Sequence, residues 1–261
     1  MPDTTQGLAI VGPGLIGTSV ALAAKRRWPE LQVRTVDKGD SLSGIGNALV
    51  IVLSAPVNAI LKAIPQLPLV IQPSALVIDT GSTKREIMAA AAAAKIRHFV
   101  GGHPMAGGTS VADARADLFD GRAWFLANPD APDAVSRAAR FVEALGAKAV
   151  VLNDHGEEHD RLMAAVSHLP QVTATMLMTI VARAIGPDNL QWAGTGLRDT
   201  TRLAASQAEV WQSVLATNSH ELRPLLKFLA SELASFADRL EDGDAVKKLF
   251  DEANRAKSAC K

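Results

Sequence analysis

A glycine-rich run near the start of the chain, Gly12-Pro13-Gly14-Leu15-Ile16-Gly17, constrains the fold more than any other stretch. It follows directly on the apolar residues 7–11 and leads into residues 18–25, which read as a helix. A buried strand, a tight glycine turn and a helix in this order predict the first unit of a parallel α/β sheet that binds a dinucleotide. Gly12 makes the turn, Gly14 lets a pyrophosphate approach the backbone, and Gly17 allows the helix to pack closely on the strand.

The residues that follow this turn indicate which dinucleotide it binds. Leu15 and Ile16 lie in the glycine turn that leads into the predicted helix, whose unpaired N–H groups can bind phosphate. Asp37 follows a second predicted strand, residues 33–36. A carboxylate there binds the ribose hydroxyls and repels a 2′-phosphate. We therefore expect NAD as the cofactor and NADP as the weaker one.

Strands and helices alternate as far as about residue 153. Further strands are predicted at residues 48–53, 75–79, 98–100, 123–127 and 149–152. This alternation, with right-handed crossovers, predicts a Rossmann-type, doubly wound parallel sheet for residues 1–153. Ligands of such sheets bind beyond the carboxyl ends of the strands, so the turn Ser54-Ala55-Pro56 should face the cofactor.

A second glycine-rich stretch, Gly101–Gly108, contains one titratable side chain, His103. Its glycines and proline favour neither helix nor strand, and we predict a loop. The loop follows the strand at 98–100 and therefore lies at the same sheet edge as Ser82, which stands in the turn after the strand at 75–79. His103 is thus a candidate general base with Ser82 beside it. The alternative is a plain connection that carries a surface histidine.

From residue 154 to 261 the pattern changes to long helices, which predicts an all-helical second domain. His168 stands beside Pro170, which breaks helical hydrogen bonding, so its imidazole is either a core side chain or a ligand contact. Arg202 follows a glycine-rich loop and is a candidate partner for a carboxylate. The apolar run 176–181 should be buried in the core or in a subunit contact. Buried helix faces are expected to hold Trp211, Leu215, Leu222, Leu225, Leu226 and Phe228.

Composition excludes several classes of function. Basic and acidic residues balance at 27 each, so no global field attracts nucleic acid. Cys260 is the single cysteine, which excludes an intramolecular disulfide and fits a cytoplasmic protein. The chain begins without a signal-peptide pattern, and no uncharged apolar run is long enough to span a membrane. His155 and His159 have a metal-ligand spacing but no third ligand, so we expect no metal site.

Five motifs together resemble the prephenate/arogenate dehydrogenase family of tyrosine biosynthesis, over residues 7–220. They are Gly12–Gly17, Asp79–Lys84, Gly102–Gly107, Ser167–Pro170 and Arg198–Arg202. The resemblance implies NAD-dependent oxidative decarboxylation of prephenate to 4-hydroxyphenylpyruvate, of arogenate to tyrosine, or of both. It implies an intertwined homodimer, with residues 154–261 as a substrate-binding and dimerisation domain.

The same resemblance implies a role for each site residue. His103 would take the proton of the ring C4 hydroxyl as C4 gives its hydride to NAD, and Ser82 would assist at that hydroxyl. His168 would line the substrate pocket, and Arg202 would pair with a substrate carboxylate.

The chain departs from the family pattern at two places. Gln171 stands where the family often has a second histidine, and Gly108 and Thr109 stand where it often has an acidic residue. We expect these residues to contact the substrate and to influence the choice between prephenate and arogenate. The length leaves no room for a fused chorismate mutase or regulatory domain, so neither is expected.

Alternatives stay open at this point. An arogenate-specific enzyme is one, and a non-catalytic NAD-binding sensor is another. A different β-hydroxyacid-type NAD(P) dehydrogenase would share the nucleotide motif, but such enzymes usually use a lysine of the helical domain. No lysine lies between Asp154 and Lys227. Thr83 and Lys84, next to Ser82, are either ligand contacts or a helix cap with a buried lysine stem.

Overall fold

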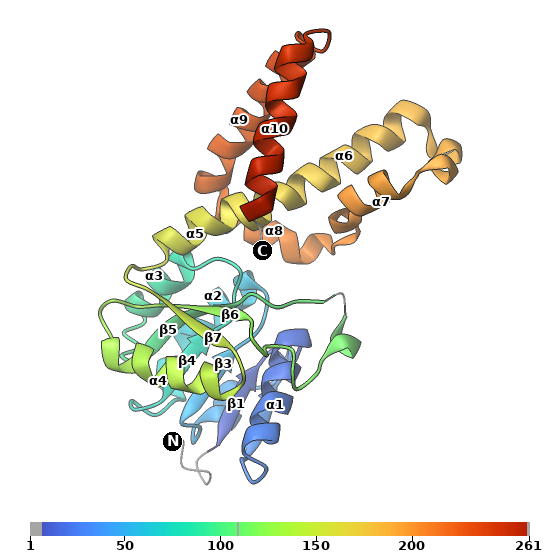
Figure 1. The fold of residues 1–261 in the computed structure, drawn as a ribbon. Helices are drawn as coiled ribbons and strands as arrows, with labels where there is room; N and C mark the ends of the chain where they lie inside the picture. Colours follow the sequence, from blue (N-terminus) through green and yellow to red (C-terminus); the bar gives the residue numbers. More distant parts are fainter. Residues whose placement is uncertain (1–6, 109, 260–261) are drawn as a thin grey trace.

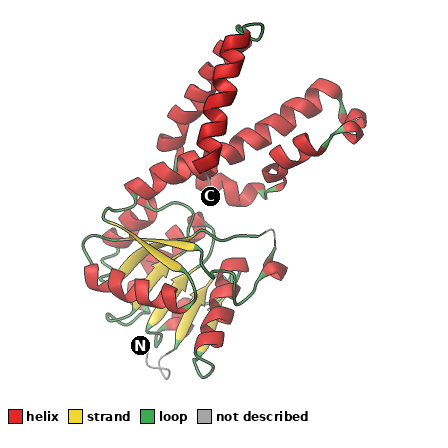
Figure 2. Ribbon diagram, viewed as in Figure 1, coloured by secondary structure: helices red, strands yellow, loops and turns green. Residues whose placement is uncertain are grey.

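The computed structural model describes residues 7–108 and 110–259. It has an α/β part at the amino-terminal side and an all-helical part at the carboxyl-terminal side (Figures 1 and 2). The sheet has seven strands in the order β2-β1-β3-β4-β5-β6-β7. The strands are β1 (Leu8–Val11), β2 (Val33–Val36), β3 (Val50–Leu53), β4 (Leu76–Asp79), β5 (Phe99–Pro104), β6 (Ala123–Ala127) and β7 (Lys148–Leu152).

Helices cover both faces of the sheet and form the whole of the second part (Figure 2). Those of the α/β part are α1 (Leu15–Arg27), α2 (Val57–Ala63), α3 (Arg85–Ala93) and α4 (Pro132–Ala144). Those of the helical part are α5 (Glu157–Met163), α6 (Leu169–Ile185), α7 (Thr195–Thr200), α8 (Ala208–Thr217), α9 (Ser219–Ala237) and α10 (Gly243–Ala259). The predicted boundary at residue 153 falls between the end of β7 and the start of α5.

The sheet departs from the predicted all-parallel arrangement at its second half. The first five strands are mutually parallel, but β6 runs antiparallel to β5, and β7 is parallel to β6. The reversal arises because no crossover helix joins β5 to β6. The chain returns through a segment that contains only a short 3-10 turn at Val111–Asp113.

The prediction of a loop at Gly101–Gly108 is wrong for its first half, because β5 continues to Pro104. Register with β6 pairs His103 with Phe125. The glycines are required by packing here: a Cβ on Gly102 would lie 2.4 Å from the Asp79 carbonyl oxygen, and one on Gly101 would lie 2.7 Å from the Met88 sulfur. They let β5 lie against its neighbours and so fix the position of His103.

Each strand sends alternate side chains into two separate cores. Leu8 and Ile10 of β1 pack on the face covered by α1 and α4, and Ala9 packs on the face covered by α2 and α3. Val214 of α8 is buried in the second of these cores. The helical part is therefore anchored on the sheet domain by apolar packing.

The long helix from Glu157 to Ile185 consists of α5, one π-helical turn (Ala164–His168) and α6. The apolar run 176–181 was expected to be buried in the core or in a subunit contact. It is not buried inside this chain, because Met176 and Ile180 are both 55% exposed. Phe228 of α9, also expected to be buried, is 65% exposed. Helices α6 and α9 belong to two helical arms that extend away from the sheet (Figure 1), and no described part of the chain covers these three side chains.

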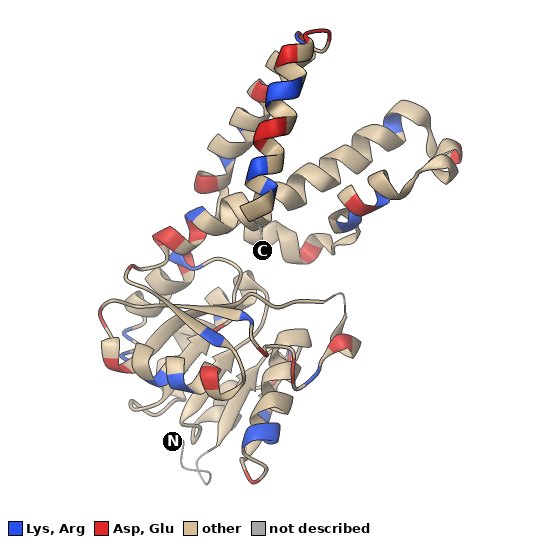
Figure 3. Ribbon diagram, in the orientation of Figure 1, with Lys and Arg blue, Asp and Glu red and all other residues tan. Residues whose placement is uncertain are grey.

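Within the described residues, this is also the one helix whose length and composition would allow it to cross a membrane. Only 22% of its most apolar 18-residue window is buried inside the chain. Along α6 the surface is almost free of charged residues (Figure 3). A helix of this kind also suits a contact between protein subunits.

Candidate active site

The nucleotide turn has the geometry that its glycines predict. Gly12 has a φ of +91°, and a Cβ there would lie 2.7 Å from the Ser54 carbonyl oxygen. A Cβ on Gly17 would lie 2.4 Å from the Gly12 carbonyl oxygen, so α1 can approach β1 only through a glycine. A Cβ on Gly14 would meet nothing within 4 Å. Space therefore remains open at the position where a pyrophosphate would approach.

The other predicted cofactor residues surround this turn. Leu15 and Ile16 are the first two residues of α1 and present its amino end. Asp37 lies one residue beyond β2, beside the turn, because the Gly12 amide donates to the Val36 carbonyl oxygen at 2.9 Å. The turn Ser54-Ala55-Pro56 follows β3 and packs against Gly12. Open space, an unpaired helix end and an acidic residue thus fit a dinucleotide with free ribose hydroxyls.

His103 is held at the carboxyl end of this sheet by the strand beside it. The Gly102 amide donates to Asp79 Oδ1 at 2.9 Å, which fixes β5 against the end of β4. The Gly81 amide donates to Asp79 Oδ2 at 2.8 Å. Asp79 also forms a fully buried ion pair with Lys84. One buried carboxylate therefore orders both the turn that carries Ser82 and the strand that carries His103.

A chain of hydrogen bonds joins His103 to the helical part. His103 Nδ1 lies 2.8 Å from His159 Nε2, and His159 Nδ1 lies 2.8 Å from Asp160 Oδ1. The Asp160 carboxylate also accepts the backbone amides of Lys84 at 2.7 Å and Arg85 at 3.0 Å, at the amino end of α3. His159 and Asp160 are fully buried. The second ring nitrogen of His103 is left for a ligand.

His168 lies at the end of the π-helical turn, directly before α6, and is 1% exposed. Asn218 fixes its tautomer. The Asn218 amide nitrogen donates to the Asp160 carbonyl oxygen at 2.7 Å and lies 3.1 Å from His168 Nδ1, which therefore accepts. The proton of a neutral His168 is then on Nε2, which has no partner among the described residues. The wide turn thus presents a hydrogen-bond donor to a ligand.

The electrostatics of the site keep the histidines neutral. Burial lowers the pKa of His103 well below the ordinary histidine value, and nearby His159, Lys84 and His168 lower it further. Burial also lowers the pKa of His159, against the opposing effect of Asp160. Although burial opposes ionisation of Asp160, its bonds from His159 and from the Arg85 and Lys84 amides lower its pKa. A neutral imidazole held next to a carboxylate relay is suited to accept a proton.

The neutral state of His168 should be visible in the pH dependence of stability. Burial lowers its pKa to about 4. Below the ordinary value of about 6.5 the unfolded chain therefore binds a proton that the folded chain does not, so the free energy of unfolding falls as pH falls from about 6.5 to about 4. The expected contribution of this side chain is about 3 kcal/mol over that window. Urea unfolding of wild type and His168→Gln measures it. Equal pH slopes for the two proteins would contradict it.

The remaining predicted residues lie around this centre. Ser82 is half-buried in the turn after β4 and makes no hydrogen bond to another described residue. Gly108 lies against the nucleotide turn, since a Cβ there would be 3.0 Å from Leu15 Cδ2. Thr109 lies outside the described residues.

Gln171 and Arg202 are connected through the backbone. Gln171 is buried, donates to the Leu203 carbonyl oxygen at 2.7 Å, and accepts from the Ser206 hydroxyl at 3.2 Å. It therefore holds the short 3-10 segment Arg202–Ala205 against α6. The side chain of Arg202 is exposed and makes no hydrogen bond or ion pair with the described residues of the histidine cluster. The structure thus brings His103 and His168 into one cluster and leaves Arg202 at its own exposed position.

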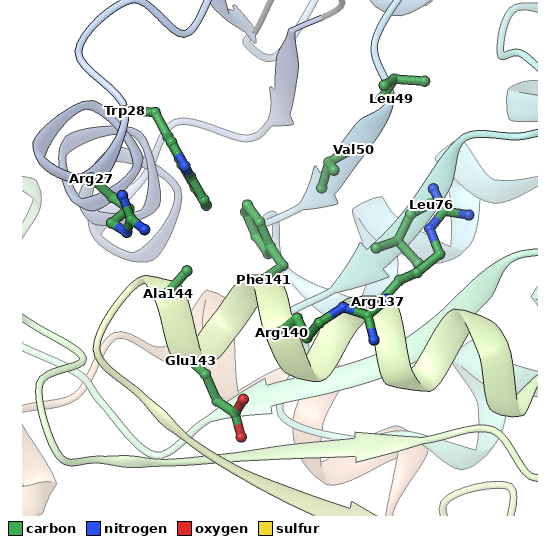
Figure 4. A pocket seen from close by; sticks show the side chains of 10 residues that line it. All are labelled: Arg27, Trp28, Leu49, Val50, Leu76, Arg137, Arg140, Phe141, Glu143 and Ala144. Atoms are coloured by element: carbon green, nitrogen blue, oxygen red, sulfur yellow. The ribbon is translucent and has the colours of Figure 1, made fainter. Parts of the chain in front are cut away.

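A cavity of about 370 Å³ lies elsewhere, between α1 and α4 (Figure 4). Leu49, Val50 and Leu76 line it from the amino ends of β3 and β4, and Trp28 stacks on Phe141 with 6.2 Å between the ring centroids. It is therefore on the opposite edge of the sheet from His103, and it takes no part in the candidate active site.

Comparison with known proteins identifies the family of this chain. Residues 15–151 match the model of the prephenate dehydrogenase nucleotide-binding domain, and residues 155–251 match that of the prephenate dehydrogenase dimerization domain. The chain belongs to the prephenate dehydrogenase family. The resemblance seen in the motifs is thereby confirmed, together with the Rossmann-type and helical domains.

Individual relatives agree with this family assignment. Prephenate dehydrogenase of Lactococcus lactis is 28% identical over 97% of this chain and 77% of its own length. Cyclohexadienyl dehydrogenase of Zymomonas mobilis is 28% identical over 97% of this chain and 96% of its own length. The structure of Aquifex aeolicus prephenate dehydrogenase with hydroxyphenyl propionate and NAD+ has a TM-score of 0.86 at 22% identity, and the match covers 97% of this chain and 96% of the other. At 22% identity, this structural similarity supports the fold alone.

Three buried polar residues of this candidate site could not be predicted from the sequence motifs. They are His159, Asp160 and Asn218. His159 is visible in the sequence only as half of a pair with metal-ligand spacing. The structure separates that pair, since His155 is exposed and faces Asp130, whereas His159 contacts His103. No group of three metal-ligating side chains occurs among residues 7–108 and 110–259. The sequence contains one signal that could have indicated these residues. His159 and Asp160 are adjacent near the start of a predicted helix whose later residues are apolar.

Proposed function

We propose that this protein binds NAD and oxidatively decarboxylates prephenate, arogenate or both. The observation that supports this best is the position of His103. Its ring lies at the same carboxyl edge of the sheet as the nucleotide turn, is bound through Nδ1 to a buried relay, and makes no hydrogen bond through Nε2 to a described residue. A neutral base at this edge of the sheet is what removal of a hydroxyl proton next to a nicotinamide requires. The enzyme would work in the cytoplasm.

In the proposed reaction His103 Nε2 accepts the proton of the ring C4 hydroxyl, and Ser82 hydrogen-bonds the same oxygen. The bound NAD supplies the hydride acceptor for C4. Loss of the ring carboxylate as CO2 makes the ring aromatic and draws the oxidation forward. The lowered pKa of His103 keeps the base unprotonated below the ordinary histidine range. Turnover should therefore persist to a lower pH than an exposed histidine would allow.

Binding of the substrate is assigned to groups on the helical domain. His168 Nε2 carries a proton that no described residue accepts, so it can donate to a substrate oxygen. Arg202, whose guanidinium forms no ion pair with a described residue, would pair with a carboxylate. Gln171 holds the Arg202 segment through Leu203, and Gly108 and Thr109 follow the histidine motif in the sequence. We propose that these three residues set the preference between prephenate and arogenate.

We further propose that the active form is a homodimer. Residues 155–251 match a dimerization domain, and the long helix Glu157–Ile185 exposes apolar side chains at Val166 in the π-helical turn and at Met176 and Ile180 in α6. Burial of such a face against a second copy removes apolar surface from water. A dimeric mass in solution at micromolar concentration is the expected result, and a monomeric mass would contradict it.

The cofactor preference should depend on Asp37, which is exposed beside the nucleotide turn. Replacing it with serine removes the charge that repels a 2′-phosphate. We expect the ratio of kcat/KM for NAD to that for NADP to fall by about 10-fold, as one like-charge contact of ~1.4 kcal/mol would give. Steady-state kinetics with both cofactors measures the ratio. An unchanged ratio in Asp37→Ser would remove this residue from cofactor selection.

The activity itself is tested by adding each substrate to the purified protein with NAD or NADP and following NADH or NADPH absorbance. Formation of 4-hydroxyphenylpyruvate from prephenate, or of tyrosine from arogenate, is the expected result. The ratio of the two kcat/KM values defines the physiological substrate. Silence with both substrates and both cofactors would overturn the proposal.

A further inference from the structure

We propose that His159 and Asp160 are positioning residues that set the tautomer of His103, so that its Nε2 carries no proton and faces the substrate. The catalytic role of these two residues rests on the proposed function. Its structural content, the location of the ring protons of His103 and His159, can be tested without any substrate.

The direction of the hydrogen bonds follows from the carboxylate at the end of the chain. Asp160 Oδ1 accepts the Lys84 amide and can only accept from His159, so His159 Nδ1 carries the proton of that 2.8 Å contact. A neutral His159 then has a lone pair on Nε2. That lone pair, 2.8 Å from His103 Nδ1, must accept, so the proton of His103 is on Nδ1. The lone pair of His103 is left on Nε2.

The relay is held rigidly on every side. Asp160 is fixed by the Lys84 and Arg85 amides at the amino end of α3, and Asn218 donates to its backbone carbonyl. His159 is fully buried, and its ring meets those of His103 and Phe125 edge to face. The His159 and Asp160 side chains are both 0% exposed to solvent. The tautomer is therefore determined by the protein and not by solvent.

The same arrangement stabilises the proton once it has been transferred. The O–H bond of the substrate breaks, the N–H bond forms at His103 Nε2, and the positive charge lies one ring away from the Asp160 carboxylate. The charged or titratable groups that face His103 are His159 on α5, His168 on the π-helical turn, and Lys84 before α3. Lys84 is neutralised by Asp79. The Asp160 charge therefore has no competing cation in the relay.

The first measurement is nitrogen NMR of ¹⁵N-histidine-labelled wild-type protein near pH 7.5, with assignments from His103→Asn and His159→Gln. The expected result is Nδ1–H for both His103 and His159. Observation of His103 as the Nε2–H form would overturn the proposal, whether or not the protein turns over prephenate or arogenate. If the protein proved inactive with both substrates, the proposed function would fail while this readout still tested the relay.

The second measurement compares two substitutions at residue 159. His159→Phe keeps a ring but removes the acceptor, and we expect kcat to fall on the order of 10²-fold with KM nearly unchanged. His159→Gln can accept from His103 and donate to Asp160, and we expect it to recover turnover to within about 10-fold of wild type. If His159 had a structural role alone, kcat of both variants would fall in proportion to the decrease in their melting temperatures. Turnover of His159→Phe within about twofold of wild type would also overturn the proposal.

A matched control is available in the same interface between the two domains. Thr217 is buried and its hydroxyl lies 2.8 Å from that of Thr83, so Thr217→Val removes one interdomain hydrogen bond without changing a residue of the relay. We expect wild-type kcat and wild-type histidine tautomers in this variant. A comparable loss of kcat in Thr217→Val would show that domain contact, and not the tautomer of His103, limits turnover, and would contradict the inference.

Discussion

The variant His103→Asn is expected to lower kcat by about 10²- to 10⁴-fold, which is what loss of a general base usually costs. Asparagine keeps the size of the side chain close to that of histidine but cannot take a proton near neutral pH. Because His103 is held by β5 pairing and by the Gly102 amide on Asp79, the strand should keep its position in the variant. NADH formation at saturating substrate and cofactor measures the change.

A second histidine of the same region provides the control. His155 is exposed, faces Asp130 at 3.6 Å, and precedes α5 without contact to the site. His155→Asn should therefore have the kcat and KM of wild type. If His103→Asn kept activity within 10-fold of wild type, His103 would not be the base, and the proposed mechanism would be wrong even for an active dehydrogenase.

The variant Lys84→Met is expected to cost the largest amount of stability, about 3–5 kcal/mol. Lys84 is 1% exposed and pairs with Asp79, which is fully buried. Removing the ammonium leaves a buried carboxylate with only the Gly81 and Gly102 amides as donors. Urea unfolding at pH 7.5 measures the loss, and destabilisation below about 1 kcal/mol would contradict the prediction.

The same substitution on the surface separates burial from charge. Lys247 pairs with Asp251 one turn along α10, and its side chain is 73% exposed. Lys247→Met should change the free energy of unfolding by less than about 0.5 kcal/mol, because water screens an exposed pair. Because Asp79 orders the strand of His103, Lys84→Met should also reduce turnover, whereas Lys247→Met should not.

The local features of this fold could be predicted from the sequence because they depend on neighbours in the chain. Gly12 has a positive φ, and a side chain at Gly17 would collide with the Gly12 carbonyl oxygen where α1 packs on β1. Apolar runs without polar residues fix the central strands, since both faces of the sheet are covered. A turn that follows such a strand must lie at its carboxyl end. The order of strands and turns in the sequence therefore predicts that His103, Ser82 and Ser54 lie at one sheet edge.

The tertiary structure alone decided the rest, because it depends on contacts between residues far apart in the chain. The strand direction of Gly101–Pro104 follows from pairing with β6, more than 20 residues later, and not from its own composition. The exposure of Phe228 and Met176 depends on which helices pack beside them. His159 has a surface-like sequence context, yet it is buried because α5 lies across the end of β5 and meets His103 there. Periodicity reports which faces are apolar, but only packing determines which polar side chains meet inside.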